Sequence, residues 1–89
     1  MARLLLITYD LHDPAYEDDV LGYIKGHKEW DELCGSSYII VTDKDPSSVR
    51  DELKEAAEDE ITCFVCPAKA PWASRGLSKS AKSLLRKYA

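Results

Sequence analysis

The sequence of 89 residues lacks the long apolar run that a membrane protein would need. A transmembrane helix requires about 20 consecutive apolar residues, and the apolar runs of this chain are far shorter. The apolar residues that follow Met1 are also too few for a secretory leader, and they end in charge instead of a cleavage site of small residues. The sequence therefore predicts a cytoplasmic protein with no membrane partner.

Cysteines are scarce as well, since the chain has only Cys34, Cys63 and Cys66. So few thiols, in an odd number, do not form a disulfide framework. Cys63-Phe-Val-Cys66 has the spacing of a zinc or redox half-site, but its surroundings predict a β-strand, in which residues three apart point to opposite faces. No second pair of thiols is present, so we interpret the cysteines as small apolar residues.

Acidic residues are absent from the end of the chain. Residues 1–66 contain all 16 acidic residues and six basic ones, which gives a net charge of −10, whereas residues 67–89 have a net charge of +6. The basic residues of this tail are Lys69, Arg75, Lys79, Lys82, Arg86 and Lys87. Such a tail either contacts phosphate or docks on an acidic surface, and composition leaves both open.

The chain begins with an apolar segment that ends in a carboxylate. Residues 3–10 are apolar on both alternating faces up to Tyr9-Asp10, which predicts a central strand of a sheet. Asp13-Pro14 then predicts the start of a helix that runs to about Lys28, with Asp13 as the N-cap.

The remaining elements follow from turn residues and periodicity. Residues 30–34 and 35–42 predict two strands separated at Gly35, or one bent strand with a bulge there. Asp45-Pro46 begins a second helix, with Asp45 as the N-cap, and residues 61–66 form the last strand. After a connector at 67–71, Ser78 caps a tail helix with one apolar side, formed by Ala81, Leu84, Leu85 and Tyr88.

This order predicts an α+β fold, a ferredoxin-like βαββαβ sandwich with an antiparallel sheet, plus a C-terminal tail helix. We expect one domain, with a core at 1–66 and a basic extension at 67–89. Both helices of the core lie on one face of such a sheet. Because the first strand is apolar on both faces, we expect a second copy in a homodimer, or the tail, to cover the other face.

Asp10, His12 and Asp13 form the only cluster of candidate catalytic residues. Mg²⁺ or Mn²⁺ bound at Asp10 would polarise a phosphoryl oxygen or supply a hydroxide, and His12 would act as a general acid or base. Asp13 is better explained as a helix cap because Pro14 follows it. The sequence has no Ser-His-Asp order, phosphate-binding glycine loop or metalloprotease motif. In the tail, Trp72 with Lys69 and Arg75 is the nearest approach to a base-stacking site with charge around it.

The chain resembles the small CRISPR-associated adaptation nuclease superfamily, which includes the VapD toxins. The resemblance lies in the first strand ending in Tyr9-Asp10, the βαββαβ order and the strand Ser37-Tyr-Ile-Ile-Val. The tail pattern W-x-x-x-G-L, from Trp72 to Leu77, is similar to a stand-alone branch outside CRISPR loci.

The resemblance implies a ferredoxin-fold homodimer in antiviral defence, in which Asp10 of each copy lies near the dimer axis and holds a divalent metal for phosphodiester cleavage. It also makes Ser37 a candidate nucleic-acid contact. Three functions stay open: a metal-dependent endonuclease on RNA or DNA, a non-catalytic scaffold that binds nucleic acid or a partner protein, and a toxin-like ribonuclease with an antitoxin.

Overall fold

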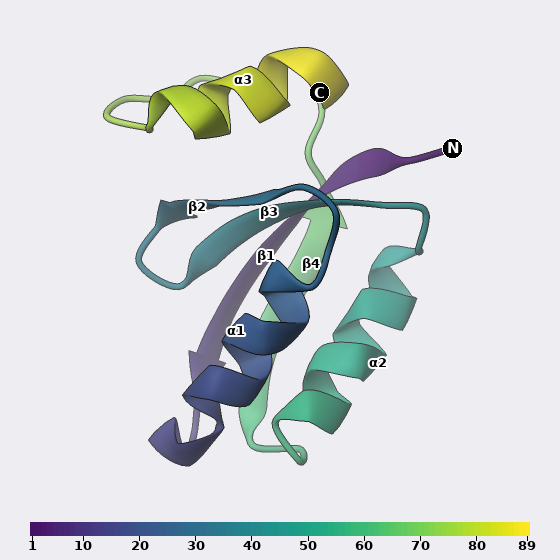
Figure 1. Cartoon of the computed structure of the whole chain (residues 1–89), viewed down its shortest axis with the longest axis vertical. Helices are drawn as coiled ribbons and strands as arrows, with labels where there is room; N and C mark the ends of the chain where they lie inside the picture. The colour runs from purple at the N-terminus through teal and green to yellow at the C-terminus, as the bar shows by residue number, and fades with distance from the viewer.

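The computed structural model describes residues 1–89 and contains one four-stranded sheet (Figure 1). The elements in chain order are β1 (Arg3–Leu11), a 3₁₀ turn η1 (Pro14–Tyr16), α1 (Glu17–Lys25), β2 (Trp30–Cys34), β3 (Ser37–Thr42), α2 (Pro46–Ala56), β4 (Ile61–Pro67) and α3 (Lys79–Tyr88). The strands lie in the order β2-β3-β1-β4, and each neighbouring pair is antiparallel. The predicted α+β fold with an antiparallel sheet and a C-terminal helix is therefore confirmed. None of the helices is long and apolar enough to cross a bilayer.

The first helical segment begins where the sequence predicts but ends earlier. The Asp13 side chain accepts a hydrogen bond of 2.9 Å from the amide of Ala15, so Asp13 caps this segment. The prediction that the helix continues to Lys28 is wrong, because α1 ends at Lys25 and Gly26 follows. Glycine is a poor helix former, and the ring of His27 satisfies carbonyl groups of the last turn.

The other helix caps differ in their chemistry. Ser78 caps α3 as predicted, since its hydroxyl accepts from the amide of Ala81 at 3.1 Å. Asp45 occupies the cap position of α2, but its side chain makes no capping bond. Instead, Arg3 Nη2 donates to Asp45 Oδ1 at 3.2 Å, which ties the start of β1 to the start of α2.

The two faces of the sheet have separate apolar clusters. One cluster lies between the sheet and α1 and α2, and its fully buried members include Leu5, Ile7, Val20 and Leu53. Figure 1 shows α1 and α2 side by side on that face. Because side chains alternate along a strand, Leu4 and Leu6 of β1 point to the other face.

Helix α3 covers part of that other face, where Leu4, Ile39 and Val41 pack against Ala81 and Leu85. Of the two covers that the sequence left open for this face, a second copy or the tail, the tail therefore occupies this part of it. The cover stops partway along β1. Beyond it lies an area that we call the open patch, made of Thr8, Asp10, Ser37, Thr62 and Phe64.

The structure also decides two points that the sequence left open, the number of strands in residues 30–42 and the arrangement of the cysteines. Residues 30–42 form two strands, with Gly35 in a left-handed turn conformation (φ +51°), and a register shift lies within β2, between Glu32 and Cys34. In β4, Cys63 lies opposite Tyr9 on the α1/α2 face and Cys66 lies opposite Leu6 on the other. All three cysteines are free.

Candidate functional site

Asp10 lies near the end of β1 with its side chain exposed in the open patch. It is directly opposite Thr62 of β4, and the two residues line a shallow depression with Thr8 and Phe64. Ser37, the predicted contact from β3, donates its hydroxyl to Thr8 Oγ1 at 3.0 Å. The register of β1 between β3 and β4 therefore gathers hydroxyl groups around this carboxylate.

His12 lies beside Thr62, the residue opposite Asp10. Its Nε2 is 2.8 Å from Thr62 Oγ1, and its Nδ1 is 3.6 Å from Glu60 Oε2. A carboxylate, an imidazole and a hydroxyl thus follow one another next to Asp10. Only Thr62 Oγ1 is within hydrogen-bond distance of the His12 ring, so Thr62 orients the ring and the Glu60 carboxylate lies just beyond that distance. Histidine is the side chain that most often acts as a general base.

The structure gives separate roles to the three candidate residues Asp10, His12 and Asp13. Asp13 is engaged in capping, which leaves Asp10 as the metal-ligand candidate of the three. No group of three or more His, Cys, Asp and Glu side chains is arranged to hold a metal ion. A Mg²⁺ or Mn²⁺ ion at Asp10 would therefore take most of its ligands from water, a substrate phosphate or a second copy.

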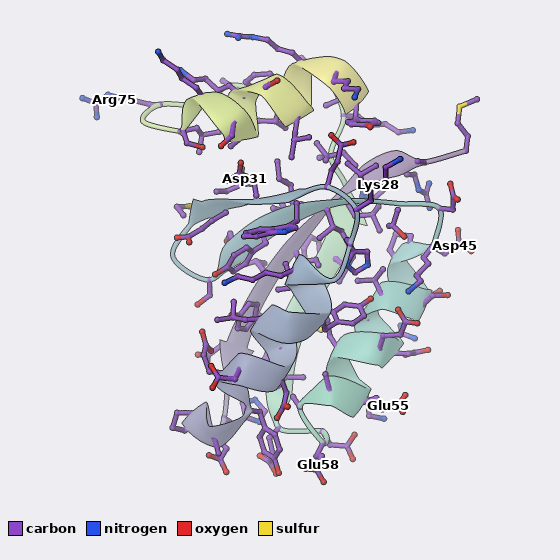
Figure 2. The ribbon with its side chains drawn as sticks, in the orientation of Figure 1. Lys28, Asp31, Asp45, Glu55, Glu58 and Arg75 are labelled. Atoms are coloured by element: carbon purple, nitrogen blue, oxygen red, sulfur yellow. The ribbon has the colours of Figure 1, made fainter.

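The predicted contacts of the tail lie away from Asp10. Lys69 and Trp72 line an apolar groove of about 310 Å³ between the tail and the sheet, together with Leu6 and Leu33. Arg75 lies in the loop before α3 and projects from the body (Figure 2). Trp72 remains 37% exposed, so it is available as a stacking surface.

Helix α3 presents its cations on the side opposite its apolar stripe. Lys79, Lys82 and Arg86 follow one another at three- and four-residue spacing, which places them on one face of the helix. We call these three residues the α3 cationic face. None of them forms an ion pair within the chain, whereas Lys87 lies 3.9 Å from Glu29. Figure 2 shows nitrogen-tipped side chains that extend from α3 away from the sheet.

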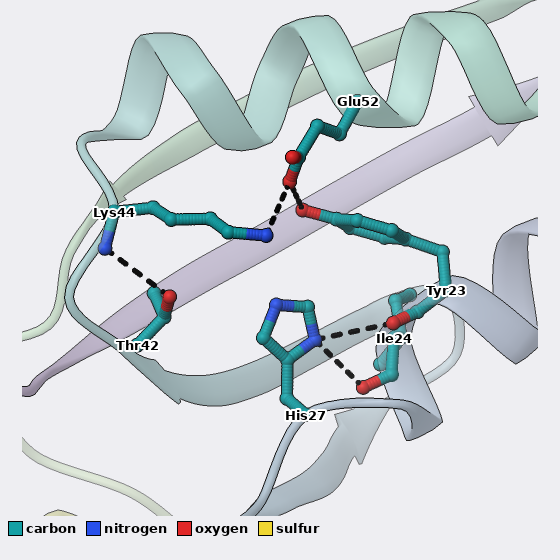
Figure 3. A network of polar contacts seen from close by, with 6 residues as sticks. All are labelled: Tyr23, Ile24, His27, Thr42, Lys44 and Glu52. Carbon is teal, nitrogen blue, oxygen red and sulfur yellow. Dashed lines mark hydrogen bonds and ion pairs between the residues drawn. The ribbon is translucent and has the colours of Figure 1, made fainter.

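A second polar network joins α1 to α2 and has a structural role (Figure 3). Tyr23 Oη and Lys44 Nζ both donate to Glu52 Oε1 at 2.7 Å. The bond from Lys44, followed by that from Tyr23, lowers the pKa of the Glu52 carboxyl. Burial, and then the bond to Glu52, raise the pKa of the Tyr23 hydroxyl. His27 Nδ1 lies 3.1 Å from the carbonyls of Tyr23 and Ile24, so this nitrogen donates.

The sequence did not single out Thr8, Thr62 or the α3 cationic face as site residues. Thr62 lies beside Asp10 only because β4 pairs with β1 in one register, across more than 50 residues of chain. The α3 cationic face did have a signal, because its spacing is helical and its segment has no acids.

Comparisons with protein-family models, curated proteins and solved structures found no match.

Proposed function

We propose that this protein binds nucleic acid in the cytoplasm, with the α3 cationic face as its contact to phosphate. The observation that carries the proposal is that Lys79, Lys82 and Arg86 share one helix face and lack acidic partners, while the opposite face of α3 holds the helix on the sheet. Lysine and arginine side chains that are fixed on a helix and not neutralised internally are suited to phosphate contacts.

The distribution of charge supports one-sided binding. Residues 1–66 have a net charge of −10, so most of the body repels a phosphate backbone. The alternative role of the tail, docking on the acidic body by charge, accounts for only one ion pair between tail and body, Lys87 with Glu29. The apolar stripe of α3 holds the tail on the sheet, and the cations of the tail other than Lys87 remain available to a ligand.

The arrangement of the chain supports the ferredoxin-like fold within this proposal. Counted from β4, the strands follow the order 4-1-3-2, all antiparallel, with α1 and α2 together on one face. That order is the one expected for a βαββαβ ferredoxin-like sandwich. The resemblance to the CRISPR-associated superfamily is consistent with it, and in that superfamily a scaffold role accompanies or replaces cleavage.

A metal-dependent endonuclease is the second candidate, and the placement of both Asp10 and His12 beside Thr62 favours it. Asp10 would hold Mg²⁺ or Mn²⁺ against a phosphate oxygen, and His12, positioned by Thr62, would take a proton from the attacking hydroxyl. A toxin-like ribonuclease would use the same residues.

The test is the salt dependence of binding to a labelled DNA or RNA duplex. Three phosphate contacts give a slope of log K against log salt of about −2.7, so affinity falls about 40-fold between 50 and 200 mM salt. Changing Lys79, Lys82 and Arg86 together to Gln should bring the slope close to zero. Adding Mg²⁺ or Mn²⁺ to the same samples reports cleavage.

A control variant with Lys25, Arg50 and Lys54 changed to Gln removes the same charge from exposed positions of the body. We expect its slope to equal that of the parent. Equal loss of affinity in both variants would mean that net charge alone drives association, and a parent that binds no duplex at 50 mM salt would overturn the proposal.

A further inference from the structure

The outer edge of β4 has backbone groups without partners. β4 pairs with β1 alone. One backbone hydrogen bond lies at each end of the β1–β4 pair. The His12 amide donates to the Glu60 carbonyl at 3.0 Å, and the Ala68 amide donates to the Leu4 carbonyl at 2.9 Å. Bonding alternates along an antiparallel strand, so the even-numbered residues between Glu60 and Ala68 bond to β1. The amide and carbonyl groups of Ile61, Cys63 and Val65 therefore point outward.

Apart from Pro67 at its end, this edge lacks the features that protect an edge strand. From Ile61 to Pro67 the strand has no charged residue, and it consists mainly of β-branched, aromatic and thiol side chains. At its centre, Phe64 is 61% exposed. The opposite edge of the sheet differs, because β2 carries Asp31 and Glu32 and is interrupted by a register shift. Charges and bulges on edge strands prevent pairing with other chains, and an uncharged, regular edge favours it.

We propose that β4 pairs with β4 of a second copy of this chain, antiparallel, about a twofold axis at Phe64. Phe64 is the middle residue of the strand, so the two phenylalanines lie opposite each other as a non-hydrogen-bonded pair, in which side chains approach most closely. Cys63 of each copy then exchanges hydrogen bonds with Val65 of the other.

The end of the strand fits the same register. Pro67 lies opposite Ile61 of the other copy, accepts a hydrogen bond through its carbonyl and lacks an amide, which is tolerated at the end of an edge strand. About six backbone hydrogen bonds form in all. A hollow between β4 and the start of α2, lined by Pro46, Ser47 and Arg50, lies along this edge and receives side chains of the second copy.

A second copy fits this edge better than an unrelated peptide does. The strand carries no charge of its own that would select a different sequence, Arg50 of α2 being the one charged side chain in the hollow beside it. Its length is also symmetric about Phe64. Pairing about a twofold axis also closes the assembly, because only the charged β2 edges remain at its two ends. The product is a dimer with one continuous sheet, in which both open patches, each with its Asp10, lie on the same side. This inference does not depend on nucleic-acid binding.

The experiment is sedimentation equilibrium of the full chain at 1–100 μM, with circular dichroism to confirm folding. We expect twice the chain mass of 10.0 kDa. Val65→Pro deletes an outward amide that bonds nothing within the chain, and Phe64→Lys places two charges at the axis, so each should raise the dimer dissociation constant about 100-fold or more. Ser37→Lys is the control, since it adds a charge to the open patch on β3, which β1 separates from β4, and it should leave the dimer intact.

A monomeric parent at 100 μM would overturn the proposal. So would a dimer that Ser37→Lys dissociates and Phe64→Lys does not, because that result would place the contact on the sheet face. If Val65→Pro fails to fold, Phe64→Lys and Ser37→Lys decide the question together, since both side chains lie outside the buried core. Loss of the dimer in Phe64→Lys alone supports the β4 edge, and loss in both variants would overturn the proposal.

Discussion

Replacement of Leu85 by Ala should release α3 from the sheet without unfolding the rest of the protein. Leu85 is 6% exposed and packs among Leu4, Ile39 and Val41. Helix α3 has ten residues, too few to be stable alone in water, so it depends on this packing. A buried Leu→Ala change costs about 2–5 kcal/mol, and a site in a two-layer contact near the surface lies at the lower end, about 2–3 kcal/mol.

A loss of that size lowers the ratio of docked to undocked helix about 30- to 150-fold. The polar contacts of the helix cannot compensate, because Lys87 and Glu29 form an exposed ion pair at 3.9 Å, which contributes less than about 1 kcal/mol. Hydrogen exchange of the Leu84, Leu85 and Arg86 amides in the middle of α3 reports the undocked population, because the amides at the ends of the helix also exchange by fraying.

Leu84→Ala is the matched control, because this substitution removes the same atoms as Leu85→Ala, but from a half-buried position on the same helix. We expect a clearly smaller loss of amide protection in that variant, and unchanged protection of β1 and β3 in both. Equal protection of the α3 amides in the parent and in Leu85→Ala would refute the account of how the tail is held.

Two further predictions concern the carboxylates. The folded pKa of Glu52 is below its usual value of 4.5, so its bonds to Lys44 and Tyr23 stabilise the fold above about pH 4.5 and this stabilisation is lost as the pH falls through the folded pKa. Glu52→Gln should therefore lose less stability than the parent in melts between pH 6 and pH 3, by under about 1 kcal/mol because the side chain is 39% exposed, and equal losses would contradict the assignment. Asp10→Asn should leave duplex affinity within about twofold. Leu4 lies beneath α3, Asp10 is about 20 Å from Leu4 along β1, and salt screens charges that are more than about 10 Å apart. The same substitution should abolish any cleavage that depends on Mg²⁺ or Mn²⁺, and cleavage equal to the parent's would place the metal elsewhere.

Local chemistry made much of the fold predictable. Asp13 and Ser78 cap helices because their side chains reach amides two and three residues away, which depends on nearby sequence alone. The apolar stripe of α3 was visible from helical periodicity, and the structure buries Ala81 and Leu85 as that stripe requires.

Long-range contacts were beyond the reach of the same reasoning. Asp45 precedes Pro46 at a helix start, as a capping residue does, yet its carboxylate accepts a hydrogen bond from Arg3, which lies 42 residues earlier in the chain. Likewise, Asp10 and His12 were identified from a strand end, but their shared neighbour Thr62 depends on which strand pairs with β1. The sequence left the surface beneath the tail open between a second copy and the chain itself, because an apolar stripe does not specify its partner.

The most direct test of the proposed function is to map duplex binding residue by residue by amide chemical shifts in the full-length protein. The account predicts that a short DNA or RNA duplex shifts the amides of Lys79, Lys82 and Arg86, and that these shifts weaken as salt rises from 50 to 200 mM. Shifts confined to Asp10 and Phe64 in the open patch, with α3 unaffected, would contradict it.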